Sequence, residues 1–206
     1  MDTILKYFPE LTDAQHRQFL IMEELYPQWN EKINVISRKD IVNLEVNHLL
    51  HSLSIVKFIR FVPGTKVLDL GTGGGFPAIP LAAYFPEVQF HLVDRIGKKL
   101  KVAQDVASHA GLTNVTIQHG DVKEVKGKFD FVVSRAVMDL GDIVPLVRRL
   151  ISSDHTNAIP NGLICLKGGD LSQEVKKYSH DVLIDELKHH FKEPFFETKK
   201  IVYLPL

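Results

Sequence analysis

The chain has 206 residues, of which 45% are hydrophobic and 24% charged, and its 25 basic side chains balance 25 acidic ones. This composition predicts one soluble domain with a substantial core, and it excludes a membrane span and a disordered chain. The balanced charge also excludes the net positive charge that would indicate a nucleic-acid partner. The opening residues lack the pattern of a secretory signal, and the single cysteine, Cys165, allows no internal disulfide, so we expect a cytoplasmic protein.

The spacing of apolar residues in the first 62 positions predicts helices. The stretch from Thr12 to about Glu31 carries apolar residues at spacings that mostly suit a helix face, with Thr12 or Asp13 as its cap. Pro27 predicts a break within it. A second helical stretch is predicted from Arg38 to Ile59.

From residue 63 onward, short β-rich runs alternate with helical stretches, which predicts a parallel sheet covered by helices on both faces. The expected strands are Lys66–Leu70, Val88–Val93, Val115–Gln118, Phe129–Ser134 and Gly162–Lys167. The expected helices are Ala78–Phe85, Lys98–Ala110 and Ile143–Ile151. Near the end, DVLIDELKHHF could be helix or strand, whereas KKIVYLPL predicts a strand beside PFFET and hence an antiparallel edge.

The stretch DLGTGGGFP, residues 69–77, places four glycines between a predicted strand and a predicted helix. Glycines let the backbone approach a ligand where a Cβ would collide, and such a loop is the usual floor of the crevice in an open α/β sheet. An ordinary tight turn is the alternative, which the number of glycines makes the weaker one. A dinucleotide fingerprint would need a glycine where Phe76 stands, and Pro77 has no N–H, so both residues suit a pyrophosphate poorly.

Acidic residues end or follow three successive predicted strands. Asp69 precedes the glycine loop, where it would favour a cation such as an α-ammonium or sulfonium, cap loop N–H groups, or do both. Asp94 can accept hydrogen bonds from ribose hydroxyls, with a helix cap as the alternative. Asp121 follows the third strand, where Val122–Lys123 can flank an adenine through backbone groups. Ribose and adenine contacts without a pyrophosphate site describe S-adenosylmethionine better than NAD.

Six segments resemble the glucose-inhibited division protein B family, the 16S ribosomal RNA guanine-N7 methyltransferases. They are WNEKINVIS, NHLLHSLSI, VLDLGTGGGFPAIPLA, HLVDRIGKKLKV, FDFVVSRAV and LICLKGG, in the family's order. The resemblance implies a Rossmann-like class I methyltransferase fold, with a mostly parallel seven-stranded sheet and an antiparallel C-terminal edge. It also implies a single domain over 1–206, with an N-terminal helical extension (1–62) and a cofactor-binding core (63–206).

The family's cofactor contacts fall on Gly71, Phe76, the Val122–Lys123 pair and Arg135. Two positions depart from the family pattern. His51 stands where the family usually has an acidic residue, and after the third strand Asp121 and Lys123 replace an R-x-E pattern. The second departure suggests that backbone groups contact the adenine. The full predicted cofactor-binding set is Asp69, Gly71, Gly73, Gly75, Phe76, Asp94, Asp121, Val122, Lys123 and Arg135.

Guanine N7 carries a lone pair and no proton, so attack on a sulfonium methyl needs alignment and no general base. We therefore assign no catalytic residue. Arg135, at the end of the fourth strand, is expected near the reacting centre, where it would hold the cofactor carboxylate or an RNA phosphate. An ion pair with Asp69 or Asp139 is the alternative. Cys165, inside an apolar strand, is expected to be inert.

The expected partner is 16S ribosomal RNA or the small ribosomal subunit; no metal site and no obligate protein partner are evident. Because the net charge is zero, RNA binding would need a local basic surface. Its candidates are Arg38, Lys39, Arg95, Lys98, Lys99, Lys101 and Lys167. Two alternatives remain: a non-catalytic cofactor- or RNA-binding module on the same fold, and an NAD-dependent oxidoreductase, which would have to explain Phe76 and Pro77.

Overall fold

The computed structural model describes residues 1–37, 39–135 and 137–206. Two sequence-based predictions touch the remaining positions. The expected start of the second helix and one member of the expected basic surface fall on Arg38, and the third position of the SRAV segment is Ala136; both lie outside the described residues.

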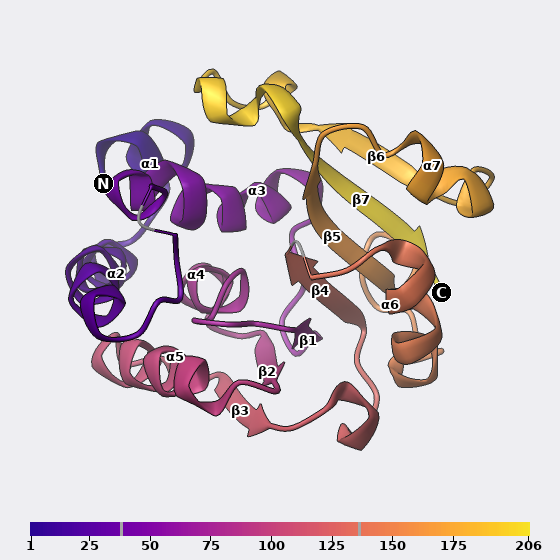
Figure 1. The fold of residues 1–206 in the computed structure, drawn as a ribbon, viewed down its shortest axis with the longest axis horizontal. Coiled ribbons are helices and arrows are strands. Elements are labelled where there is room, and N and C mark those ends of the chain that lie inside the picture. The colour runs from indigo at the N-terminus through magenta and orange to yellow at the C-terminus, as the bar shows by residue number, and fades with distance from the viewer. Residues whose placement is uncertain (38, 136) are drawn as a thin grey trace.

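Seven strands form one sheet in the order β3-β2-β1-β4-β5-β7-β6 (Figure 1). Their bounds are β1 Lys66–Leu70, β2 Gln89–Asp94, β3 Val115–His119, β4 Phe131–Arg135, β5 Gly162–Gly168, β6 Leu183–Glu186 and β7 Lys199–Pro205. Strands β1 to β5 pair in parallel, and β7 runs antiparallel to both β5 and β6. This confirms the predicted fold class. Strand order reverses between β1 and β4, which is where a parallel α/β sheet opens its ligand crevice.

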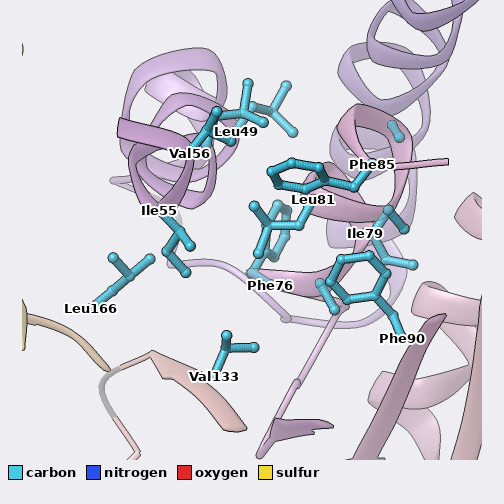
Figure 2. Close-up of a cluster of buried hydrophobic side chains, with 14 of the residues drawn as sticks. Leu49, Ile55, Val56, Phe76, Ile79, Leu81, Phe85, Phe90, Val133 and Leu166 are labelled. Carbon is cyan, nitrogen blue, oxygen red and sulfur yellow. The ribbon is translucent and has the colours of Figure 1, made fainter. Parts of the chain in front are cut away.

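Helices cover both faces of the sheet. One buried cluster joins sheet residues such as Val133 to α1 (Asp2–Tyr7), α2 (Asp13–Lys32), α3 (His51–Phe58), α4 (Ala78–Tyr84) and α5 (Gly97–His109). Figure 2 shows part of this cluster, with Phe76 among side chains from α3, α4 and the strands. A second cluster lies under α6 (Leu140–Val147) and α7 (Ser172–Val175). The N-terminal helices thus share a core with the sheet, while the division into extension and core stays a prediction.

The helix α2 continues through Pro27, so the predicted break there is wrong. Its first turn is closed by a capping box between Thr12 and Gln15, so the cap is Thr12, one of the two residues predicted for that role. A proline inside a helix costs about 3 kcal/mol, because one backbone hydrogen bond is lost. Burial of Met22 and Tyr26 before the proline, and of Asn30 after it, holds both halves against the core and offsets that cost.

The second N-terminal helical stretch is not one regular helix. A 3₁₀ turn at Ile41–Asn43 is followed by a π-helical turn at Glu45–Leu50 and then by α3. The π turn matters for the site, because it buries His48 together with Leu49 and Leu50. Among the described residues, no helix combines the length and the apolar character needed to cross a membrane.

The C-terminal segment differs from the prediction in one pairing. The ambiguous stretch after residue 180 contains strand β6, followed by a 3₁₀ turn at Leu187–His189. The predicted strand partner, PFFET, is itself a 3₁₀ turn, with Pro194 at its first position and Phe196 buried. A proline has no N–H for a strand ladder, so β7 pairs instead with β5 and β6.

Candidate functional site

A cavity of about 510 Å³ opens at the strand-order reversal, beyond the carboxyl ends of β1, β2 and β4. Its walls come from the glycine loop, the turn after β2, residues 120–123, the end of β4 and Val35 of the N-terminal segment. The cavity is lined by the predicted residues Gly71, Gly73, Phe76, Asp94, Asp121, Val122, Lys123 and Arg135. The other two predicted residues, Asp69 and Gly75, lie behind this lining.

The backbone of the glycine loop forms the cavity floor. Gly71 and Gly73 have positive φ values of 68° and 58°, which L side chains rarely adopt. The Gly71 N–H donates to the carbonyl of Val93 at 2.9 Å, which anchors the loop to the neighbouring strand. A Cβ on Gly71 would stand 2.7 Å from Cγ2 of Val137. Glycine at this position therefore leaves room for the Val137 side chain to pack against the loop.

Gly75 serves packing between helices. A Cβ there would stand 2.4 Å from Cγ1 of Ile79 and 3.1 Å from the Tyr26 hydroxyl, and its φ is 105°. The same Tyr26 hydroxyl donates a hydrogen bond of 2.9 Å to the carbonyl of Gly74. Gly75 thus lets α2 approach the start of α4, and it shapes the cavity from behind.

Asp69 lies fully buried beneath the loop. Its Oδ2 accepts hydrogen bonds from the Thr72 hydroxyl at 2.6 Å and from the Ala78 N–H at 3.1 Å. These contacts are the capping role that the sequence left open. Burial raises the pKa of Asp69 to about 7. Its Oδ1 has no hydrogen-bond partner among the described residues.

Two further carboxylates stand at the strand ends around the cavity. Asp94 accepts from the Gly73 N–H through Oδ2 and from the Ile96 N–H through Oδ1, both at 2.8 Å. Asp121 caps the 3₁₀ turn Val122–Glu124, with its Oδ1 accepting from the Lys123 N–H at 2.9 Å. This cap uses the Lys123 N–H. Asp121 makes no hydrogen bond to the N–H of Val122, the other residue of the predicted adenine pair.

The side chain of Arg135 points toward the N-terminal helices. Residues two apart on a strand share a face, and Val133 belongs to the cluster that those helices cover. The Arg135 Cζ lies 4.7 Å from the centroid of the Phe76 ring. The Tyr26 ring lies 4.5 Å from the same centroid and the His48 ring 5.2 Å from it. Phe76 is therefore packed by an aromatic, an imidazole and a cation while it lines the cavity.

The guanidinium of Arg135 has few polar partners among the described residues. Its Nη1 is buried and has no hydrogen-bond partner in the described part of the chain. Burial lowers the pKa of Arg135 to about 10, while Asp69 is the largest influence that acts to raise it. No salt bridge from Arg135 to Asp69 or Asp139 occurs among the described residues, although the sequence offered both as alternatives. A buried donor of this kind is costly unless a ligand accepts from it.

Val35 is a lining residue that sequence reasoning missed. Asn30 at the end of α2 accepts from the N–H groups of Val35 and Ile36, both at 2.9 Å, and donates to the carbonyl of Ile36 at 2.9 Å. This clamp holds the Val35 side chain over the glycine loop, where a Cβ on Gly74 would stand 3.0 Å from it. The WNEKINVIS segment contains both residues, but nothing in its spacing indicates a contact with the loop.

The candidate RNA-binding residues differ in their exposure to solvent. Arg95 and Lys99 line the cavity mouth, and Lys98 and Lys101 are exposed on α5. Lys167, by contrast, pairs with Glu174 and donates to the carbonyl of Met138 at 2.7 Å, with only 9% of its side chain exposed. Its ammonium is committed inside the protein, so the expected contact with RNA backbone is not favoured by its surroundings.

Comparisons with known proteins agree with this architecture. A family model described as GidB, rRNA small subunit methyltransferase G, matches residues 15–202. The chain is 58% identical over 206 residues to the ribosomal RNA small subunit methyltransferase G of Phocaeicola vulgatus, covering 100% of this chain and 99% of that protein. It is 59% identical over 203 residues to the protein of the same name from Bacteroides thetaiotaomicron, covering 98% of each chain.

Solved structures show the same fold at low identity. The magnesium protoporphyrin IX methyltransferase of Synechocystis PCC 6803, with bound SAM, matches 95% of this chain and 98% of its own at a TM-score of 0.61 and 16% identity. The precorrin-6y C5,15-methyltransferase of Geobacter metallireducens matches 84% and 92% at a TM-score of 0.58 and 14% identity. From the family match over residues 15–202 and the full-length relatives, the chain belongs to the rRNA small subunit methyltransferase G family.

Proposed function

We propose that this protein transfers the methyl group of S-adenosylmethionine to N7 of a specific guanine in 16S ribosomal RNA, acting in the cytoplasm on the RNA or on the small ribosomal subunit. The observation that carries the proposal is the cavity at the strand-order reversal, in a chain of this family. The names of full-length relatives at 58% and 59% identity support the ribosomal RNA substrate.

The residues around the cavity suit this cofactor. Asp94 can accept from the ribose hydroxyls, and the Val122 N–H can donate to the adenine ring. At the other end, Arg135 lines the cavity, and its buried donor Nη1, which has no partner among the described residues, matches the carboxylate of the amino-acid tail. Asp69 lies behind this wall, where its charge would favour the ammonium of the same tail.

A pyrophosphate fits the same loop less well. Phe76 replaces the third glycine of a dinucleotide fingerprint, and its ring is buried at the cavity wall. The Ala78 N–H, in the first turn of α4, already donates to Asp69. Because N–H groups of this turn would have to hold the phosphates, these contacts favour a methyltransferase over an NAD-dependent oxidoreductase.

The chemistry requires positioning more than proton transfer. When bound, S-adenosylmethionine supplies an electrophilic methyl group on a sulfonium. Guanine N7 attacks with a lone pair and loses no proton, so the residues of this chain need only to align the reactants and exclude water. Val35, Phe76 and Val137 give the cavity an apolar wall near Arg135 against which a flat base can pack. Arg95 and Lys99 at the mouth can contact RNA phosphates.

Mapping of 7-methylguanosine in 16S ribosomal RNA tests the proposal. Naked RNA and small subunits lacking the modification are incubated with S-adenosylmethionine and the protein, and cleavage at the methylated base is then induced chemically. Modification of one guanine is expected, and Arg135→Ala should abolish it in a folded protein. Cofactor binding without transfer to either substrate would instead support the non-catalytic alternative, and methylation at another base atom would refute the N7 assignment.

A further inference from the structure

Arg135 and His48 contact the same aromatic ring, and each carries buried nitrogen without a partner. Arg135 Cζ lies 4.7 Å and the His48 ring 5.2 Å from the centroid of Phe76. Both ring nitrogens of His48, and Nη1 of Arg135, are buried with no hydrogen-bond partner among the described residues. A buried polar group left in this state costs about 1–3 kcal/mol. Two such groups against one ring indicate an interaction that forms when the site is filled.

The two groups are chemically complementary. Burial, and then the charge of Arg135, lower the pKa of His48 to about 3, so the imidazole is neutral. A neutral imidazole always has one nitrogen with a free lone pair, whereas a guanidinium can only donate. His48 also lies in the π-helical turn Glu45–Leu50, and π turns occur frequently at functional sites.

Two carboxylates near Arg135, Asp40 and Asp69, already accept hydrogen bonds from other groups. Asp40 holds the Ser37 hydroxyl at 2.6 Å and the Asn47 amide at 3.3 Å. Asp69 holds the Thr72 hydroxyl and the Ala78 N–H through Oδ2, whereas its Oδ1 has no partner among the described residues. His48 is the unpartnered acceptor that shares the Phe76 ring with Arg135, and one N–H of Nη1 can donate to it while the other donates to the cofactor carboxylate.

We infer that His48 is a positioning residue: it accepts a hydrogen bond from Arg135 in the filled site and thereby directs the guanidinium at the carboxylate of the cofactor. This inference rests on the proposed function, because it requires Arg135 to hold that carboxylate. His48 acts only through Arg135, so it affects ligands that carry a carboxylate and spares ligands that lack one. A residue that merely packs against Phe76 would affect both kinds of ligand.

Calorimetry with two ligands tests this role. S-adenosylhomocysteine carries the amino-acid tail, whereas 5′-methylthioadenosine has the same nucleoside without it. His48→Phe keeps a ring against Phe76 and removes both nitrogens, and His48→Gln keeps an acceptor. Loss of one hydrogen bond to a charged group predicts about tenfold weaker S-adenosylhomocysteine binding by His48→Phe. Its 5′-methylthioadenosine affinity should be unchanged, and His48→Gln should recover most of the lost affinity.

A double-mutant cycle separates coupling from packing. In an Arg135→Met background, His48→Phe should cause no further loss of S-adenosylhomocysteine affinity, because the group it orients is gone. An undiminished affinity of His48→Phe, an equal loss for both ligands, or a full additional loss in the Arg135→Met background would each overturn the positioning role. The proposed function fails separately, if the wild-type protein binds S-adenosylhomocysteine but methylates no ribosomal RNA.

Discussion

The carboxylate of Asp94 accepts a hydrogen bond of 2.8 Å from the backbone N–H of Gly73, 21 residues earlier in the chain. Its second oxygen accepts from the Ile96 N–H at the same distance. One side chain thus joins the glycine loop after β1 to the turn after β2. This double contact fixes two walls of the cavity relative to each other, and it keeps the carboxylate where a ribose would lie.

Asp94→Asn should weaken S-adenosylhomocysteine binding by about 10- to 100-fold. The amide replaces one acceptor oxygen with a donor, so a backbone N–H or a ribose hydroxyl loses a charged partner, at a cost of about 1.5–3 kcal/mol. Calorimetry measures the effect. Asp142→Asn, which alters an exposed carboxylate on α6, is the matched control and should bind normally. Equal affinities in the two variants would show that Asp94 serves only as a cap.

Gly75→Ala should destabilise the fold. Its Cβ would stand 2.4 Å from Ile79, and its φ of 105° disfavours any L side chain. Overpacking and backbone strain together predict a loss of about 2–4 kcal/mol in the free energy of unfolding. Urea denaturation measures this loss, and a change below 1 kcal/mol would mean that α2 and α4 can separate to accommodate a methyl group.

Gly73→Ala, in the same loop, should weaken cofactor binding and leave the protein folded. The nearest atom to its Cβ, Lys99 Cδ, is 4.0 Å away, so only the left-handed backbone conformation opposes the substitution, at about 1–2 kcal/mol. The new methyl group stands on the cavity floor, so S-adenosylhomocysteine affinity should fall by at least tenfold while the protein stays folded. Unimpaired binding at this position would place the cofactor elsewhere in the cavity.

Cys165→Ala should preserve methyl transfer to within about twofold. The thiol is 1% exposed inside β5, and burial raises the pKa of Cys165 to about 12, so no nucleophilic thiolate is available at neutral pH. Removing a small buried group predicts a stability loss of about 1 kcal/mol. Turnover of the folded variant is the measurement, and its abolition would point to a covalent mechanism on a carbon atom instead of direct attack by N7.

Local sequence chemistry was sufficient to predict the parts of the site that one loop or one strand end creates. The glycines, Asp94 and Asp121 follow predicted strands whose carboxyl ends meet at one edge of the sheet. Phe76 was a predictable departure from a pyrophosphate loop, because it occupies the third-glycine position of that fingerprint, and Pro77 lacks the N–H that would face a phosphate. The fold class followed for the same reason, since alternating strands and helices have few stable arrangements.

Roles that depend on distant packing could not be predicted in this way. Whether Gly75 faces the ligand or α2 depends on where Tyr26 lies. The Lys167 ammonium is occupied by Glu174 and the Met138 carbonyl, which approach only in the folded chain. Val35 reaches the loop because Asn30 clamps its backbone. In each case the deciding contact joins elements whose relative placement no local pattern encodes.

Asp69 should make folding stability depend on pH in an unusual direction. Its pKa in the folded protein is about 7 because burial penalises the charge, against an ordinary value of 3.8. Between these values the folded chain keeps a proton that the unfolded chain has released, so stability falls as pH rises. Relative to Asp69→Asn, wild-type stability should decrease by about 1.4 kcal/mol per pH unit between roughly pH 4.5 and 6.5.

Urea denaturation of both proteins across this range isolates Asp69, because the other titrating groups cancel in the difference. Asp142→Asn controls for the loss of an exposed carboxylate and should show no such slope. A difference that stays constant with pH would mean that Asp69 is ionised throughout. The positive charge of Arg135, whose effect on the pKa of Asp69 is to lower it, would then outweigh burial, and the two residues would form a charged pair that is ready for the zwitterionic tail.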